Sequence, residues 1–302
     1  MKHEKKVILL AGPTASGKSK LAIKLAKYFN GEIINADSMQ IYKEISILNS
    51  KPSSENIKVI KHHLYGFNSV KKNFSTGHWL EMVIKKIEQL WKNGRTPIVV
   101  GGTGLYFKVL TDGLVKIPNI PIKVRNEIRS LQKKIGQKKF YQKLIKVDPF
   151  IIDLINPNDV QRSIRAYEVK IFTKKSLFDW FKNTKRYFDK NEFFKIYIDF
   201  PRPELINRIN DRVDLMFKNG AINEVKRFLK LKIKTENSPN KVIGINEISS
   251  YLKKDLNLAE AKERIAIKTR QYAKRQSTWA RGQMSSWQKI DYRDLSTFLK
   301  KF

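Results

Sequence analysis

The chain has 302 residues, of which 41% are hydrophobic, so it is long enough for a substantial core and longer than a typical single domain. It has no apolar run long enough to span a membrane, and the absence of cysteine excludes disulfides and thiolate zinc sites. The net charge of +33 indicates a polyanionic partner such as nucleic acid, although an AT-rich genome would also enrich lysine.

The first predicted elements are a strand, a glycine-rich loop and a helix. Residues 7–11 form a short apolar run typical of a buried strand, and a helical pattern follows the loop at once. Between them, GPTASGKS fits G-x-x-x-x-G-K-[ST] at every fixed position, which predicts a diphosphate or triphosphate site. Lys18 supplies a cation for the outer phosphate, and the Ser19 hydroxyl offers a ligand to Mg²⁺. The predicted phosphate-binding residues are Gly12, Pro13, Thr14, Ala15, Ser16, Gly17, Lys18 and Ser19. The basic start resembles a signal peptide, but its apolar run leads into this loop, so we expect a cytoplasmic protein.

A second strand is predicted over 32–36, and it ends at Asp37. Ligands of open parallel sheets bind outside the carboxyl ends of the strands, so we expect Asp37 to face the same crevice as the phosphate loop. It is a candidate metal ligand, a candidate general base, or only the N-cap of the next turn. Residues 43–73 are expected to be irregular, and the adjacent His62 and His63 are expected to point in different directions rather than to share a metal.

A helix over 79–91 and a third strand over 96–100 come next. That strand ends in Gly101-Gly102-Thr103-Gly104, and another helix is predicted over 105–110. Three glycines with a central threonine are more than a tight turn needs. We therefore expect this turn to bring backbone N–H groups and the Thr103 hydroxyl into the crevice.

The pattern changes after a boundary at 118–121, because only helical periodicity is present from there to about residue 188. Helices are predicted over 122–134, 137–147, 158–172 and 176–183. On the third of them, Arg162 and Arg165 share a face and Gln161 lies beside them. This face is either an ordinary solvated surface or a reader of phosphates and base edges.

A strand over 193–200 resumes the sheet, and helices over 204–218, 221–231, 244–252 and 258–281 precede a weak strand over 287–291. The helix over 258–281 is long and basic with interleaved aromatics, which favours a groove-lining or partner-facing element. The predicted fold class is therefore α/β. A parallel-sheet core of the P-loop NTPase type spans 1–120 and 190–302, and an all-helical insertion domain spans 121–189.

An ordered series of segments resembles the tRNA dimethylallyltransferases, also called tRNA isopentenyltransferases, of bacterial type. The series is GPTASGKS, NADSMQIYK, PIVVGGTGLY, NPNDVQRSIRAYEV and TRQYAKRQSTW, and the resemblance covers nearly the whole chain. It implies transfer of a dimethylallyl group from dimethylallyl diphosphate to N6 of adenosine 37, beside the anticodon, in tRNAs reading codons that begin with U. The phosphate loop would then hold a diphosphate leaving group, with Mg²⁺ as cofactor.

The resemblance also implies roles for individual residues. Asp37 matches the general base, Thr103 matches a residue near the reacting centre, and Lys18 would stabilise the leaving group. The implied tRNA-binding residues are Asp37, Ser38, Met39, Gln40, Thr103, Arg125, Gln161, Arg162, Ser163, Ile164, Arg165, Lys241, Val242, Ile243, Gly244, Ile245 and Asn246. Residues 44–50 and 245–246 depart from the family pattern, which leaves the RNA contacts there open.

Two other functions fit parts of the sequence. A P-loop small-molecule kinase would use ATP in the same loop, but it would need only a compact lid in place of the helical block. A basic RNA-binding protein without catalysis would leave the intact Lys18, Ser19 and Asp37 unexplained. For the transferase, the expected partners are tRNA and dimethylallyl diphosphate, with no membrane, and we expect a monomer.

Overall fold

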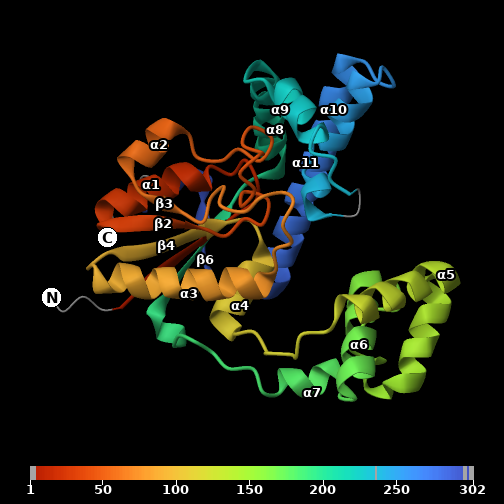
Figure 1. Ribbon diagram of the computed structural model, residues 1–302. Helices are drawn as coiled ribbons and strands as arrows, with labels where there is room; N and C mark the ends of the chain where they lie inside the picture. The colour runs from red at the N-terminus through yellow and green to blue at the C-terminus, as the bar shows by residue number, and fades with distance from the viewer. Residues whose placement is uncertain (1–4, 235–236, 295–297, 299–302) are drawn as a thin grey trace. The chain divides into compact units, whose positions relative to one another are not determined.

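The computed structural model describes residues 5–234, 237–294 and 298. The chain divides into two compact units, Met1–Thr111 with Tyr187–Phe302, and Asp112–Arg186 (Figure 1). The first unit contains the sheet, and the second is helical. Over the described residues, no helix combines the length and apolar character that crossing a bilayer requires.

The described residues form a six-stranded, all-parallel sheet in the order β3-β2-β4-β1-β5-β6. The strands are β1 (Val7–Ala11), β2 (Gly31–Asn35), β3 (His62–His63), β4 (Thr96–Gly101), β5 (Phe193–Asp199) and β6 (Gln288–Asp291). Every residue of β1 and β2 is buried, as expected for parallel strands that are covered on both faces. The predicted α/β class is confirmed, and β5 pairs with β1 from Val7 opposite Phe193, so the sheet resumes after the helical block.

Helices α1 (Lys18–Tyr28) and α3 (Thr76–Lys92) cover opposite faces of the sheet (Figure 1). The predicted apolar face of α1 is buried, since Leu21, Ala22, Leu25 and Ala26 are all at most 1% exposed. The prediction of irregular chain over 43–73 is wrong in two places. This stretch contains α2 (Ser54–Val59) and the edge strand β3, both too short to give a periodic signal.

The remaining helices of the first unit follow the predicted order. They are α4 (Gly104–Asp112), α8 (Arg202–Lys218), α9 (Ala221–Leu229), α10 (Ile245–Leu252) and α11 (Leu258–Gln283), with short 3₁₀ turns at Lys190–Glu192, Ser238–Lys241 and Tyr292–Asp294. Helices α8 to α11 pack on one another. Asn257 caps α11, because its side chain accepts from the backbone N–H of Glu260 while Glu260 accepts from that of Asn257.

The second unit contains α5 (Ile122–Val147), α6 (Val160–Thr173) and α7 (Leu177–Phe181), with a 3₁₀ turn at Pro149–Ile151. Gly136 breaks α5 with φ 76° and ψ 165°, which agrees with the two helices predicted on either side of it. Phe140, Leu144 and Val169 are fully buried in this unit's own core. A tRNA-contacting domain over 121–189 stays a prediction.

Candidate active site

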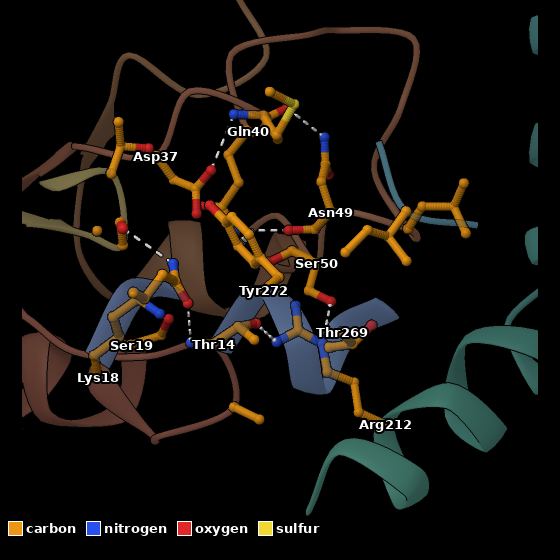
Figure 2. Close-up of a pocket in the computed structure, with 18 of the residues that line it drawn as sticks. Thr14, Lys18, Ser19, Asp37, Gln40, Asn49, Ser50, Arg212, Thr269 and Tyr272 are labelled. Atoms are coloured by element: carbon orange, nitrogen blue, oxygen red, sulfur yellow. Dashed lines mark hydrogen bonds between the residues drawn. The ribbon is translucent and has the colours of Figure 1, made fainter. Parts of the chain in front are cut away.

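The sheet unit contains a cavity of about 960 Å³ at the carboxyl ends of its central strands, part of which is drawn in Figure 2. This is the crevice that the strand order predicts for an open parallel sheet. Its walls come from the phosphate loop, residues 37–40, residues 48–50, residues 100–104, α8, residues 241–243 and α11. The structure therefore brings Lys18, Asp37 and Thr103 together, although they follow three different strands.

The phosphate loop has two residues in the left-handed region, Ala15 with φ 64° and Gly17 with φ 87°. Gly17 precedes the first residue of α1, so the start of that helix faces the cavity. The Nζ of Lys18 donates to the carbonyl of Pro13 at 3.2 Å. Burial lowers the pKa of Lys18 to about 8; the charge of Asp37 opposes this shift and that of Arg212 adds to it.

Arg212 on α8 is a site residue that the sequence analysis did not single out. Its Nη1 donates to Thr14 Oγ1 and its Nε to Ser50 Oγ, both at 2.9 Å (Figure 2). Burial lowers its pKa and Asp37 opposes that shift. Among the described residues, no carboxylate lies within ion-pair distance of Arg212. Lys18 and Arg212 thus share the charge of Asp37, and an anion would balance the surplus positive charge.

Asp37 is held by its own turn. Its Oδ1 accepts from the backbone N–H of Met39 at 2.9 Å, and its backbone N–H donates to Asn35 Oδ1 at 2.8 Å. The predicted capping role of Asp37 is therefore met by a local turn, and no helix follows that turn. The bond within the turn uses only one of the two carboxylate oxygens. Burial, and to a smaller degree the charge of Asp37, raises the pKa of Tyr65 and Tyr272 well above the ordinary value, so both phenols stay protonated.

Thr103 joins the turn after β4 to the turn after β2. Its Oγ1 accepts from the Ser38 backbone N–H at 2.9 Å and lies 3.2 Å from Ser38 Oγ. The expectation that this turn offers its backbone N–H groups to a ligand is wrong for Thr103, because that N–H donates to the Ala36 carbonyl at 3.1 Å.

Close packing explains the three glycines around Thr103. A Cβ at Gly101 would overlap the backbone of Ala36, one at Gly102 would overlap Gln276, and one at Gly104 would overlap the Trp279 ring. The surplus of glycine that suggested a ligand-binding turn therefore lets β2 and α11 approach the turn.

Gln276 on α11 is a second residue that the sequence analysis missed. Its Oε1 accepts from the backbone N–H of Thr14 at 2.8 Å, and its Nε2 donates to the carbonyl of Gly102 at 3.0 Å. Helix α11 also contributes Thr269, Tyr272 and Trp279 to the cavity wall, as the prediction of a groove-lining helix required. Only the ordered family series contained a signal for Gln276, since no local pattern marks it.

Two of the RNA-binding segments implied by the resemblance lie in this unit. Ser38, Met39 and Gln40 line the cavity, and Gln40 Nε2 also donates to the carbonyls of Asn49 and Ser50 at 2.8 and 2.9 Å. In the segment 241–246, residues 241–243 line the cavity, whereas Ile245 is 1% exposed and belongs to the core. Gly244, at φ 108°, is covered by Leu48, and Asn246 is exposed.

The third such segment and Arg125 lie in the helical unit. Gln161 and Arg162 are exposed, while Ser163 and Ile164 are buried in the core of that unit. The buried carboxylate of Glu168 lies 3.5 Å from Arg165 Nη1 and 3.6 Å from Arg129 Nε. Burial lowers the pKa of Arg165; the charge of Glu168 opposes this shift and that of Arg125 adds to it. Two arginines therefore pair with one buried acid, and the charge of a third, Arg125, acts on Arg165.

Among the described residues, no three His, Cys, Asp or Glu side chains are grouped so that they could hold a metal ion. The two adjacent histidines bond different partners, since His62 Nδ1 lies 2.7 Å from the Ile60 carbonyl and His63 Nε2 lies 2.6 Å from Glu32 Oε2. The oxygen groups of Ser19 and Asp37 both line the cavity beside the phosphate loop.

Comparison with known proteins gives consistent matches. A family model described as IPP transferase matches residues 40–283. The tRNA dimethylallyltransferase of Pelagibacter ubique (strain HTCC1062) is 57% identical over 301 residues, covering 100% of this chain and 96% of that protein. That of Rickettsia massiliae (strain Mtu5) is 42% identical over 296 residues, covering 98% and 82%.

Two solved structures have the same fold. A eukaryotic dimethylallyltransferase acting on tRNA has a TM-score of 0.83 at 31% identity, covering 97% of this chain and 75% of that one. The full-length tRNA isopentenylpyrophosphate transferase from Bacillus halodurans has a TM-score of 0.71 at 29% identity, covering 98% and 95%.

Proposed function

The chain belongs to the IPP transferase family, the family of the tRNA dimethylallyltransferases, and we propose that it transfers a dimethylallyl group from dimethylallyl diphosphate to N6 of adenosine 37 in tRNA. The proposed substrates are tRNAs that read codons beginning with U. The observation that carries the proposal is one cavity in which the phosphate loop and two half-buried cations, Lys18 and Arg212, lie with the Asp37 carboxylate.

The two cations suit the leaving group of this reaction. As the bond between the allylic carbon and the diphosphate oxygen breaks, its electron pair moves onto the diphosphate. Lys18, Arg212 and the free N–H groups of the phosphate loop stabilise that charge as it develops. Arg212 is held in place beside the loop, because it donates to Thr14 and Ser50.

Asp37 suits the other half of the reaction. The exocyclic amine of adenine is a poor nucleophile and must lose a proton as its bond to the allylic carbon forms. The Asp37 carboxylate accepts that proton as general base, since its backbone turn holds it beside the phosphate loop. The adenine must leave its stack to enter the cavity, where Tyr65 and Tyr272 provide protonated aromatic side chains.

The residues present fit a magnesium ion that is held jointly with the diphosphate. Mg²⁺ usually binds through one or two protein oxygens plus substrate phosphates rather than in an all-protein cage. Ser19 supplies such an oxygen beside the loop, and the described residues contain no cage of acidic side chains. When bound, the ion would neutralise charge on the departing diphosphate.

One incubation tests the proposal against its alternatives. The protein is given an unmodified tRNA with labelled dimethylallyl diphosphate or with labelled ATP, and adenosine 37 is then analysed by mass. We expect the allylic label to enter tRNA and the mass of adenosine 37 to rise by one isopentenyl unit. A tRNA with guanosine at position 37 is the control. An unaltered nucleoside would refute the transfer, and ATP turnover without RNA would indicate the kinase.

A further inference from the structure

The peptide unit between Pro13 and Thr14 is held at both of its polar groups. Lys18 Nζ and the Ser16 backbone N–H each donate to its carbonyl at 3.2 Å, and Gln276 Oε1 accepts from its N–H at 2.8 Å. The Thr14 side chain next to it accepts from Arg212 Nη1 at 2.9 Å. The carbonyl of this peptide and the side chain of Thr14 are therefore the acceptors of the two cations.

The other amides of the loop are left for a ligand. Among the described residues, the backbone N–H groups of Ala15, Gly17, Lys18 and Ser19 donate to no protein acceptor. The N–H of Thr14 differs, because a side chain from α11 occupies it. Rotation of the Pro13–Thr14 peptide would turn its carbonyl away from Lys18 and from the Ser16 N–H, and the bond from the Thr14 N–H to Gln276 opposes that rotation.

Gln276 is itself fixed tightly enough to do this. Its Nε2 donates to the carbonyl of Gly102 at 3.0 Å. The absence of a side chain at Gly102 makes the room for it, since a Cβ there would overlap the Gln276 amide. The amide is therefore held at the turn after β4, and it reaches the phosphate loop from α11.

We propose that Gln276 is a positioning residue, which sets Lys18 and Arg212 for the diphosphate by locking the Pro13–Thr14 peptide. This inference rests on the proposed function, because it takes the diphosphate as the ligand of the loop. Gln276 acts through the peptide and the two cations, and it takes no part in proton transfer.

The test measures the binding of magnesium pyrophosphate to the full chain by equilibrium titration. Gln276→Ala removes both amide contacts, and Gln276→Asn shortens the side chain so that it no longer reaches Thr14. We expect both variants to weaken pyrophosphate binding about tenfold. Their affinity for tRNA, and their thermal unfolding midpoint without ligand, should stay close to those of the unmutated protein. Gln283→Ala is the matched control, because Gln283 lies on the same helix and bonds the exposed Lys108.

A double-mutant cycle separates positioning from general support of the fold. If Gln276 acts through the cations, its removal costs less affinity when Arg212→Lys has already broken the bond to Thr14. Additive losses, an unchanged pyrophosphate affinity, or an equal loss of tRNA affinity would each overturn the inference. If one of these results is found while the unmutated protein still transfers the allylic label to tRNA, only the role of Gln276 is refuted. If the unmutated protein transfers no label, the proposed function itself is refuted.

Discussion

Lys18 is the residue whose charge state responds to pH near the working range of the site. Burial lowers its pKa to about 8, so the side chain is a cation below that pH and neutral above it. Tyr65 and Tyr272 do not ionise in this range, because burial raises their pKa. A neutral Lys18 has no charge to offer the diphosphate.

We therefore expect kcat/KM for dimethylallyl diphosphate to fall as pH rises through about 8, because this ratio reports ionisations of the free enzyme. Rates measured across that range at saturating tRNA give the profile. In Lys18→Arg the alkaline fall should disappear, since a guanidinium stays protonated. If kcat/KM falls at the same alkaline pH in the unmutated protein and in Lys18→Arg, the ionisation belongs to another group.

Asp37 allows a substitution that keeps its structure and removes its chemistry. In Asp37→Asn the amide oxygen can still accept from the Met39 backbone N–H, so the turn is retained while the proton acceptor is lost. We expect single-turnover transfer to slow by about 10²–10⁴-fold, the usual range for a general base, with tRNA affinity nearly unchanged. Equal losses of rate and of affinity would show that Asp37 serves to bind tRNA.

At the scale of elements, the segment 46–50 is held in place from α9. Glu224 is 2% exposed and accepts from the backbone N–H groups of Ser46, Ile47 and Leu48 at 2.7–3.2 Å. The segment includes Ser50, which accepts from Arg212. Residues 48–50 of this segment form part of the cavity wall.

Glu224→Gln replaces one acceptor oxygen with a donor that faces a backbone N–H. We expect it to lower the free energy of unfolding by about 2–4 kcal/mol, because buried donors lose their partner. The KM for dimethylallyl diphosphate should rise as well, since Ser50 no longer holds Arg212. Urea denaturation and steady-state kinetics measure the two effects. Glu263→Gln, an exposed position on α11, should change neither, and a Glu224 variant as stable as the unmutated protein would contradict the argument.

The glycine turn gives a second comparison at this scale. Gly104→Ala would push a methyl group into the Trp279 ring, whereas Gly282→Ala on α11 meets open space. We expect the first to lower the free energy of unfolding by about 1–3 kcal/mol, the usual cost of overpacking. The second should be neutral or slightly stabilising, as alanine favours a helix. Equal thermal unfolding midpoints for the two variants would show that the turn around Gly104 shifts to make room for the methyl group beside Trp279.

Strands and helices could be predicted from the sequence where one hydrophobic pattern continues over most of the element. The short apolar runs of β1 and β4 and the periodic faces of α1 and α3 are local features, and the structure agrees with them. The two-residue strand β3 exists only because β2 pairs with it. Arg212 and Gln276 lie 198 and 262 residues from Thr14, and no local pattern contains such contacts. The motifs were enough to locate the cavity, but they did not predict that Arg212 contributes a positive charge to it.

For the whole molecule, the net charge of +33 indicates a contribution to tRNA binding that depends on salt. Each phosphate that a lysine or arginine neutralises releases counterions, so affinity falls as salt concentration rises. Much of this charge is spread over the surface. The arginines of α6 are each paired with an acid, because Arg162 lies 3.5 Å from Asp159 and Arg165 lies 3.5 Å from Glu168.

If these arginines bind the tRNA backbone, replacing Arg162 and Arg165 with alanine together should weaken binding and make its salt dependence shallower. The slope of log affinity against log salt should fall by about 0.7–0.9 for each phosphate that is no longer neutralised. Titrations of one tRNA at several salt concentrations measure it. Lys175→Ala with Lys182→Ala removes the same charge on either side of α7 and should change the slope less. An equal change in both double variants would mean that α6 acts through net charge alone, because losing two charges anywhere on the unit would then have the same effect.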